Sequence, residues 1–309
     1  MNVVVVGAGT MGPGIAQVFA MGGYDVTLTD IRDDILQRAI QRIRESLEAF
    51  VRHGVLDKNA ADNAFLRITY STDNIEAAKK CDFMIEAVPE NLQLKRQIFS
   101  LYEEYSKNNT ILASNTSGIP IKDIAEAVKR KERVLGVHFY NPAHLNTLVE
   151  IIRTEYTTDE FVDKAKQILI TCNKKPVVVV DIPGFLHNRL IYALLREAVS
   201  LVEQGLTTIE DVDTVVREAF GPRFSILGLF KLVDIVGLDI YYNVSSYLNK
   251  YLSTDSTASN WIKAKIDNGE LGMKAGRGFY EWDEETKKTT MAALNAEMIR
   301  LIKNLKNYR

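Results

Sequence analysis

Short apolar runs alternate with stretches of helical periodicity along the first 180 or so residues of the chain. Strands that alternate with helices in this way are typical of a parallel sheet covered by helices on both faces. The pattern therefore predicts strands at NVVVV (2–6), DVTLTD (25–30), DFMIEAV (82–88), TILAS (110–114), VLGVHF (134–139), TLVEII (147–152) and PVVVV (176–180).

One helical stretch is long and highly charged for a connection between neighbouring strands. Residues 33–53 carry apolar side chains at a helical period, and Gly54 follows as a natural stop. Together with Leu56 to Leu66, this stretch predicts a helical hairpin over about residues 33–66 that projects from the sheet.

The strand pattern disappears after Pro183 and Gly184, where residues 185–204, 208–220 and 227–252 have the pattern of successive helices. We therefore expect an α/β domain over 1–183, with a doubly wound, mostly parallel sheet of the Rossmann type. A smaller, all-helical domain should follow over 184–309. Apolar residues such as Leu190, Leu194 and Leu201 on its first helix are numerous enough for a subunit interface.

Composition narrows the range of partners. The 309 residues include 38 basic and 40 acidic side chains, so no charge excess favours nucleic acid or a membrane surface. Cys81 and Cys172 lack the spacing of metal ligands, and we expect reduced thiols and no metal site. No apolar run has membrane-spanning length and no cleavable signal is apparent. The expectation is a cytoplasmic protein whose substrate is a small molecule.

The segment VVVVGAGTMGPGIA contains the most informative motif of the chain. Gly7 permits a tight turn after the strand, Gly9 lets the backbone approach a pyrophosphate, and Gly12 lets the new helix pack closely. Asp30 ends the next strand about 20 residues downstream, where an acid binds a ribose 2′-hydroxyl. NAD is therefore the expected cofactor, although Arg32 leaves NADP open. The predicted cofactor loop comprises Gly7, Gly9, Thr10, Met11 and Gly12.

Several further motifs resemble those of the 3-hydroxyacyl-CoA dehydrogenase family. They are SNTSGIP (114–120), VHFYNP (137–142), LVEII (148–152), PGFLHNRL (183–190), IEAVPENLQLKRQIF (85–99) and LGMKAGRGFYEW (271–282), and with the glycine loop they span nearly the whole chain. The resemblance implies an acid/base pair at His138 and Glu150, with Ser117 and Asn188 as polar groups for the substrate. It also implies a homodimer.

The resemblance further implies that Glu90 and Lys95, with Asn115, lie near the cofactor. Lys95 alone fits equally well as a solvated lysine on a charged helix face. A buried carboxylate such as Glu150 is costly, so we expect a cation near it.

These residue types suit the oxidation of a secondary alcohol. A base must take the hydroxyl proton while the carbon-bound hydrogen leaves as hydride, and a histidine does this near neutral pH. Glu150 would hold the tautomer of His138, and Ser117 and Asn188 would hydrogen-bond an oxygen whose charge changes. The expected reaction is NAD-dependent oxidation of a short L-3-hydroxyacyl-CoA, such as 3-hydroxybutyryl-CoA.

Three local departures from the acyl-CoA enzymes keep other substrates open. Arg52-His53-Gly54 stands where those enzymes often have paired lysines, AHLNT (143–147) replaces an apolar-then-lysine pattern, and GPRFSILG (221–228) resembles the gulonate and carnitine relatives and lambda-crystallin. If CoA is bound, Ser46 and Arg52 should contact its phosphates. If the substrate is a small free hydroxy acid, Arg223 suits its carboxylate. A non-catalytic, crystallin-like NAD-binding protein is a further alternative.

Overall fold

The computed structural model describes residues 1–305, with side chains described through residue 301. The chain divides into two compact units, one over Met1–His187 and one from Asn188 onward.

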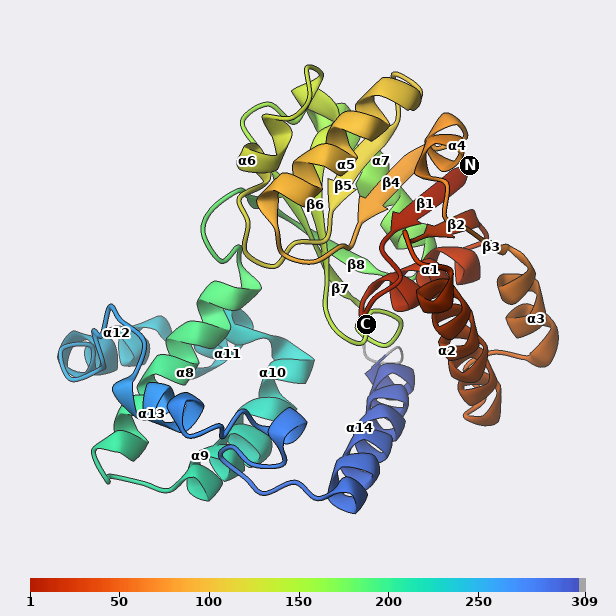
Figure 1. The fold of residues 1–309 in the computed structure, drawn as a ribbon. Coiled ribbons are helices and arrows are strands. Elements are labelled where there is room, and N and C mark those ends of the chain that lie inside the picture. Colours follow the sequence, from red (N-terminus) through yellow and green to blue (C-terminus); the bar gives the residue numbers. More distant parts are fainter. Residues whose placement is uncertain (306–309) are drawn as a thin grey trace. The chain divides into compact units, whose positions relative to one another are not determined.

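The first unit is built on one eight-stranded sheet (Figure 1), with strand order β3-β2-β1-β4-β5-β6-β7-β8. The seven expected strands are all present, which confirms the doubly wound α/β fold. The eighth, β3, was not predicted, because this edge strand is short and none of its residues is buried. The strands are β1 (Asn2–Val6), β2 (Asp25–Thr29), β3 (Ile68–Ser71), β4 (Phe83–Glu86), β5 (Ile111–Ser114), β6 (Val134–Phe139), β7 (Leu148–Arg153) and β8 (Lys175–Val180).

The sheet is parallel except where β6 pairs with β7. Only residues 140–147 join these two strands, and a parallel connection needs a crossover of a dozen or more residues. The short link therefore forces the chain to turn back on itself. The resulting antiparallel register makes His138 the direct partner of Glu150.

Helices cover both faces of the sheet because the strands are apolar on both sides. In β1, Val3 and Val5 belong to the core on one face, and Val4 and Val6 to the core on the other. The first core is covered by α1 (Gly12–Met21), α2 (Asp33–Arg52), α3 (Lys58–Leu66) and α7 (Asp159–Thr171), and the second by α4 (Asn74–Lys79), α5 (Leu92–Tyr105) and α6 (Ile121–Ala125).

The expected hairpin consists of α2 and α3. Buried residues of both helices, such as Ile43 and Ala61, belong to the first core, so the base of the hairpin is anchored to the α/β unit. A single-turn 3₁₀ helix, Lys131–Arg133, precedes β6.

The second unit is helical, as expected, but the predicted single helix over 227–252 is wrong. Gly237 has a φ of 110°, a conformation that ends one helix before the next begins. A π-helical segment, Val216–Phe220, lies between α9 and α10. The helices are α8 (His187–Glu203), α9 (Ile209–Val215), α10 (Gly221–Leu227), α11 (Leu229–Val236), α12 (Leu238–Leu248), α13 (Asn260–Asp267) and α14 (Glu284–Leu305), with a 3₁₀ turn at Met273–Ala275.

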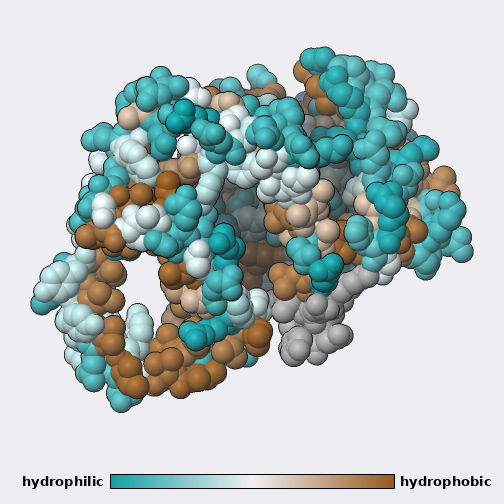
Figure 2. All heavy atoms as spheres, turned by 90° about the horizontal axis from the view of Figure 1, so that it is seen from below, coloured by the Kyte–Doolittle hydropathy of each residue, from teal (hydrophilic) through white to brown (hydrophobic). Residues whose placement is uncertain are grey.

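Hydrophobic side chains of this unit remain accessible. None of the residues in α8 to α13 is buried. Phe230 is 83% exposed and Tyr242 is 71% exposed, which is unusual for large apolar groups. Hydrophobic surface gathers over the left-hand part of Figure 2, where Figure 1 draws these helices. Among the described residues, no helix has the length and apolar character needed to cross a membrane.

Candidate active site

His138 and Glu150 face each other across the antiparallel pair β6 and β7. Directly opposed residues of such a pair project from the same face of the sheet and their side chains lie close together. His138 Nδ1 lies 3.0 Å from Glu150 Oε2, and the two residues are only 3% and 1% exposed. The register of two strands therefore sets the geometry of the acid/base pair.

Glu150 accepts hydrogen bonds on both carboxylate oxygens. Oε2 accepts from the Tyr140 hydroxyl as well as from His138, and Oε1 accepts from the backbone N–H groups of Leu186 and His187, each at 2.9 Å. Burial by itself would raise the pKa of Glu150, but these hydrogen bonds outweigh it and lower the pKa to about 2. The cation expected near Glu150 is thus replaced by an imidazole, a phenol and two backbone donors.

An ionised Glu150 also settles the tautomer of His138. Because a carboxylate only accepts hydrogen bonds, Nδ1 must carry the proton, and Nε2 is left as the basic nitrogen. Nε2 lies 3.1 Å from Ser117 Oγ, on the loop that follows β5. Nε2 is therefore the atom that can take a proton from a hydroxyl group beside Ser117.

A strained turn after β8 supplies the two backbone donors. Gly184 has a φ of 78° and Phe185 a φ of 51°, a left-handed conformation that a residue with a side chain rarely adopts. Phe185 is 1% exposed and its ring centroid lies 5.8 Å from that of His138. The turn thus closes one side of the site and brings the backbone of Leu186 and His187 to Glu150.

The carboxylate of Glu90 binds the backbone of Ser117 and the hydroxyl of its neighbour Thr116. The Ser117 N–H donates to Glu90 Oε1 at 2.7 Å, and the Thr116 hydroxyl donates to the same carboxylate. Lys95 Nζ lies 3.3 Å from Glu90 Oε2. A continuous chain of polar contacts therefore runs from Lys95 through Glu90 and Ser117 to His138.

Lys95 is not the solvated lysine that its charged sequence context allowed. It is 1% exposed, and its Nζ donates to Glu86 Oε1 at 2.7 Å. Glu86 in turn accepts from Ser114 Oγ at 2.6 Å. A buried ion pair at the ends of β4 and α5 therefore stands behind the loop that carries Ser117.

The glycine loop has the geometry that a dinucleotide requires. A Cβ on Gly12 would lie 1.8 Å from the carbonyl oxygen of Gly7, so this helix start can pack only as glycine. Gly7 has a φ of 104°, whereas a Cβ on Gly9 would meet no protein atom within 4 Å. Met11, which precedes α1, provides no side-chain cap. Open space therefore borders an uncapped helix N-terminus, where a pyrophosphate fits.

Asp30 and Arg32 have different partners in the structure. Asp30 Oδ2 accepts from the Ala8 N–H at 2.9 Å, which places this carboxylate against the glycine loop. The Arg32 guanidinium instead makes two hydrogen bonds to Asp34, at 2.8 and 2.7 Å. Arg32 is therefore already paired with a carboxylate other than Asp30.

Two contacts in the candidate site had no signal in the sequence. Arg42 of α2 donates to the carbonyl oxygens of Gly9 and Thr10, at 3.1 and 3.3 Å. The other is the hydrogen bond from the Tyr140 hydroxyl to Glu150 Oε2. Asn115, predicted from the resemblance, uses its side-chain oxygen to accept from the Phe139 N–H at 2.8 Å, which joins the loop after β5 to β6.

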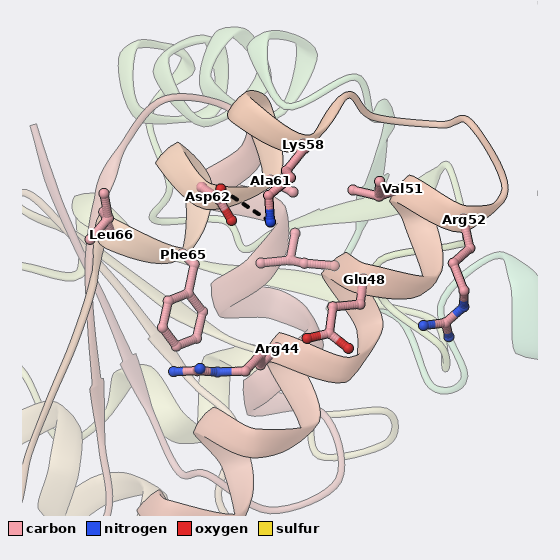
Figure 3. A pocket seen from close by; sticks show the side chains of 10 residues that line it. Arg44, Glu48, Val51, Arg52, Lys58, Ala61, Asp62, Phe65 and Leu66 are labelled. Carbon is pink, nitrogen blue, oxygen red and sulfur yellow. Dashed lines mark ion pairs between the residues drawn. The ribbon is translucent and has the colours of Figure 1, made fainter.

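The hairpin does not bring Ser46 and Arg52 together. Ser46 Oγ is buried and has no hydrogen-bond partner among the described residues. Arg52 is exposed and lines a cavity of about 740 Å³ between α2 and α3, together with Arg44 and Lys58 (Figure 3). Ser46 does not line this cavity.

A buried lysine, Lys174, makes hydrogen bonds to the loop of residues 140–147. Lys174 Nζ donates to the carbonyl oxygens of Ala143 and Asn146, at 2.7 and 2.6 Å, and burial lowers its pKa to about 8. His144 packs against Phe50, and burial lowers its pKa to about 4, so it is neutral at physiological pH.

The two remaining predicted site residues belong to the second unit. Asn188 is the second residue of α8 and is partly buried, and Arg223 is exposed on α10. Among the described residues, no group of three or more histidine, cysteine or acidic side chains is arranged to hold a metal ion.

Comparison with known proteins identifies both units. The model of the 3-hydroxyacyl-CoA dehydrogenase NAD-binding domain matches residues 2–182, and that of the C-terminal domain of the same enzymes matches residues 184–282. A 5-formyl-3-hydroxy-2-methylpyridine 4-carboxylate 5-dehydrogenase from Mesorhizobium japonicum is 38% identical over 97% of this chain and 95% of its own length.

Two solved structures are similar over most of the chain. The crystal structure of a 5-formyl-3-hydroxy-2-methylpyridine 4-carboxylic acid 5-dehydrogenase, an NAD⁺-dependent dismutase, is 33% identical, with a TM-score of 0.92 over 99% of this chain and 98% of its own. The (S)-3-hydroxybutyryl-CoA dehydrogenase PaaH1 from Ralstonia eutropha is 31% identical, with a TM-score of 0.77 over 92% and 99%. The chain is thus an NAD-dependent oxidoreductase and belongs to the 3-hydroxyacyl-CoA dehydrogenase family.

Proposed function

We propose that this protein oxidises a hydroxyl group of a small acid that carries a free carboxylate, with NAD as hydride acceptor. The observation that carries the reaction is the alignment of Glu150, His138 and Ser117, in which only Nε2 of His138 is left as a base. The same constellation works in reverse, because a protonated Nε2 can return its proton to a carbonyl oxygen.

The residues divide the work of the oxidation between them. NAD, when bound, accepts the hydride from the substrate carbon. Nε2 of His138 takes the hydroxyl proton, so that a C–H and an O–H bond break and a carbonyl forms. Ser117 and Asn188 hydrogen-bond the reacting oxygen, and Glu150 stabilises the imidazolium until its proton leaves.

The cofactor would bind to residues between Asp30, at its ribose end, and Glu90, at its nicotinamide end. Gly9, Thr10 and Met11 border the open helix N-terminus that receives the pyrophosphate, and Asp30 accepts from the ribose hydroxyls. Glu90 and Asn115 follow the carboxyl ends of β4 and β5, and Lys95 lies in the first turn of α5 beside Glu90. These three residues would lie toward the nicotinamide end.

Burial of Ser46 Oγ supports a substrate smaller than an acyl-CoA. A hydroxyl that is closed off from solvent cannot bind a phosphate, and Arg52 lines a cavity that Ser46 does not reach. The Mesorhizobium relative is named for a substrate that carries a free carboxylate. An exposed arginine such as Arg223 can hold a carboxylate by two parallel hydrogen bonds.

A short 3-hydroxyacyl-CoA is the second candidate substrate. Three basic side chains line the hairpin cavity in Figure 3, namely Arg44, Arg52 and Lys58. Glu48 and Asp62 line it too, and Asp62 pairs with Lys58, so the two arginines are the groups that phosphates of CoA would complement. Relatives such as the Ralstonia enzyme are named for this substrate class.

The reaction is tested by following NADH formation with a panel of substrates. The panel contains 3-hydroxybutyrate, gulonate, carnitine, 5-formyl-3-hydroxy-2-methylpyridine 4-carboxylate (whose hydrate offers the same C–H and O–H bonds) and 3-hydroxybutyryl-CoA. With the accepted substrate, His138→Gln should lower turnover by about two to four orders of magnitude while NAD still binds. Near-normal turnover of this variant would remove His138 as the base.

Two arginine variants distinguish the substrate classes. With a free acid, Arg223→Ala should lower kcat/KM by about tenfold to a hundredfold, because a charge-assisted pair is lost, while Arg52→Ala stays near wild type. Each variant serves as the matched control of the other, since both arginines are exposed. Saturable activity with 3-hydroxybutyryl-CoA alone, lost in Arg52→Ala and kept in Arg223→Ala, would establish the second candidate instead.

Selectivity for NAD should depend on the charge of Asp30. Calorimetric titration of the wild type should show NAD bound at least about tenfold more tightly than NADP, because Asp30 would repel a 2′-phosphate. Asp30→Asn keeps a hydrogen-bond acceptor for the Ala8 N–H and should narrow this ratio. The matched control Arg32→Ala should leave it unchanged, since Arg32 pairs with Asp34. If only Arg32→Ala changed the ratio, Arg32 would control the ribose pocket.

We also propose that the protein is a homodimer that associates through its helical unit. Helices α8 to α13 have no buried residue, so a second copy would bury hydrophobic surface that one chain leaves in water.

Light scattering coupled to gel filtration should give twice the chain mass of 34.8 kDa at micromolar concentration. A single species of the chain mass would show that these helices remain uncovered in solution.

A further inference from the structure

Tyr140 is the residue that follows β6, and its ring lies directly beside that of His138. Its hydroxyl donates to Glu150 Oε2, the same oxygen that accepts from His138 Nδ1 at 3.0 Å. The other oxygen, Oε1, already accepts from two backbone N–H groups. The phenol and the imidazole therefore share one carboxylate oxygen.

The ring of Tyr140 is held independently of its hydroxyl. Its centroid lies 4.5 Å from the His138 ring, at an interplanar angle of 56°, and 4.4 Å from the His187 ring, at 48°. Burial and the hydrogen bond to Glu150 raise the pKa of Tyr140, so the phenol stays protonated and can only donate to this carboxylate. A phenylalanine would keep the ring contacts and remove the hydrogen bond alone.

We propose that Tyr140 is a positioning residue that sets the working pH of the base, because its hydroxyl competes with His138 Nδ1 for Glu150 Oε2. This proposal rests on the proposed role of His138.

The direction of the effect follows from the charge of the carboxylate. A hydrogen bond from Tyr140 withdraws charge from Oε2, so Glu150 attracts the protonated imidazole less strongly. The enzyme should therefore keep its activity to a lower pH than it would without the Tyr140 hydroxyl.

We expect the remaining groups near His138 to keep their contacts when the Tyr140 hydroxyl is removed. Among the residues that the structure describes, the titratable groups that contact His138 are Glu150 on β7 and Tyr140. His187 packs on the Tyr140 ring, and Glu90 with its partner Lys95 contacts the loop that carries Ser117. His187 lies against the Tyr140 ring, which a phenylalanine preserves. A change in pH dependence therefore reports the lost hydrogen bond.

The test is the variant Tyr140→Phe. The acidic limb of its kcat/KM profile should move to higher pH by about half a pH unit to one pH unit, while the plateau at high pH stays within about threefold of wild type. Without substrate, the His138 ring signals should titrate in NMR with a shift of the same sign. Tyr70→Phe, which removes an exposed hydroxyl on β3, should change neither measurement.

A double variant tests that the hydroxyl acts through Glu150. In a Glu150→Gln background, Tyr140→Phe should cause no further shift of the ring titration. A lower plateau with an unmoved acidic limb and ring titration would overturn the proposal, as would an equal shift in both backgrounds. Because the ring titration needs no substrate, it separates this proposal from the base assignment, which His138→Gln tests.

Discussion

A carboxylate buried in a protein is unfavourable unless hydrogen bonds replace the water that it loses. Glu150 meets this constraint with four donors, which come from β6, from Tyr140 just after it and from the turn that ends the α/β unit. These donors link Glu150 to the imidazole of His138, to the hydroxyl of Tyr140 and to the backbone of Leu186 and His187. A single anion thus couples the register of β6 and β7 to the start of α8.

The second support of the site is the ion pair between Lys95 and Glu86. It is buried at the ends of β4 and α5 and connects through Glu90 to the loop that carries Ser117. Since the loss of one partner leaves an uncompensated buried charge, the pair resists rearrangement of that loop. His138 is therefore held from two sides, at Nδ1 by Glu150 and at Nε2 by Ser117, before any substrate arrives.

The sequence predicts those parts of the molecule that depend on local pattern. The glycine loop can be predicted from the sequence because one tight turn requires glycine at both Gly7 and Gly12. The pairing of His138 with Glu150 was implied only by the family resemblance, and the structure shows its physical cause, the short link between β6 and β7. The burial of Lys95 and of Ser46 Oγ depends on tertiary packing. Both residues lie on helices with many charged side chains, where the sequence alone favours exposure to solvent. The role of Tyr140 could not be predicted from the sequence, because it depends on the acceptor of the hydroxyl, which only the structure shows.

The most direct measurement of this account is the ionisation of Glu150 itself. The ¹³C carboxyl signal of labelled glutamate, assigned by its absence in Glu150→Gln, should stay that of the ionised form as the pH falls from 7 to about 4, since its pKa is lowered to about 2. A carboxyl that takes up its proton at or above about pH 4.5 would show that the donors do not hold the anion. The orientation of His138 would then need another cause.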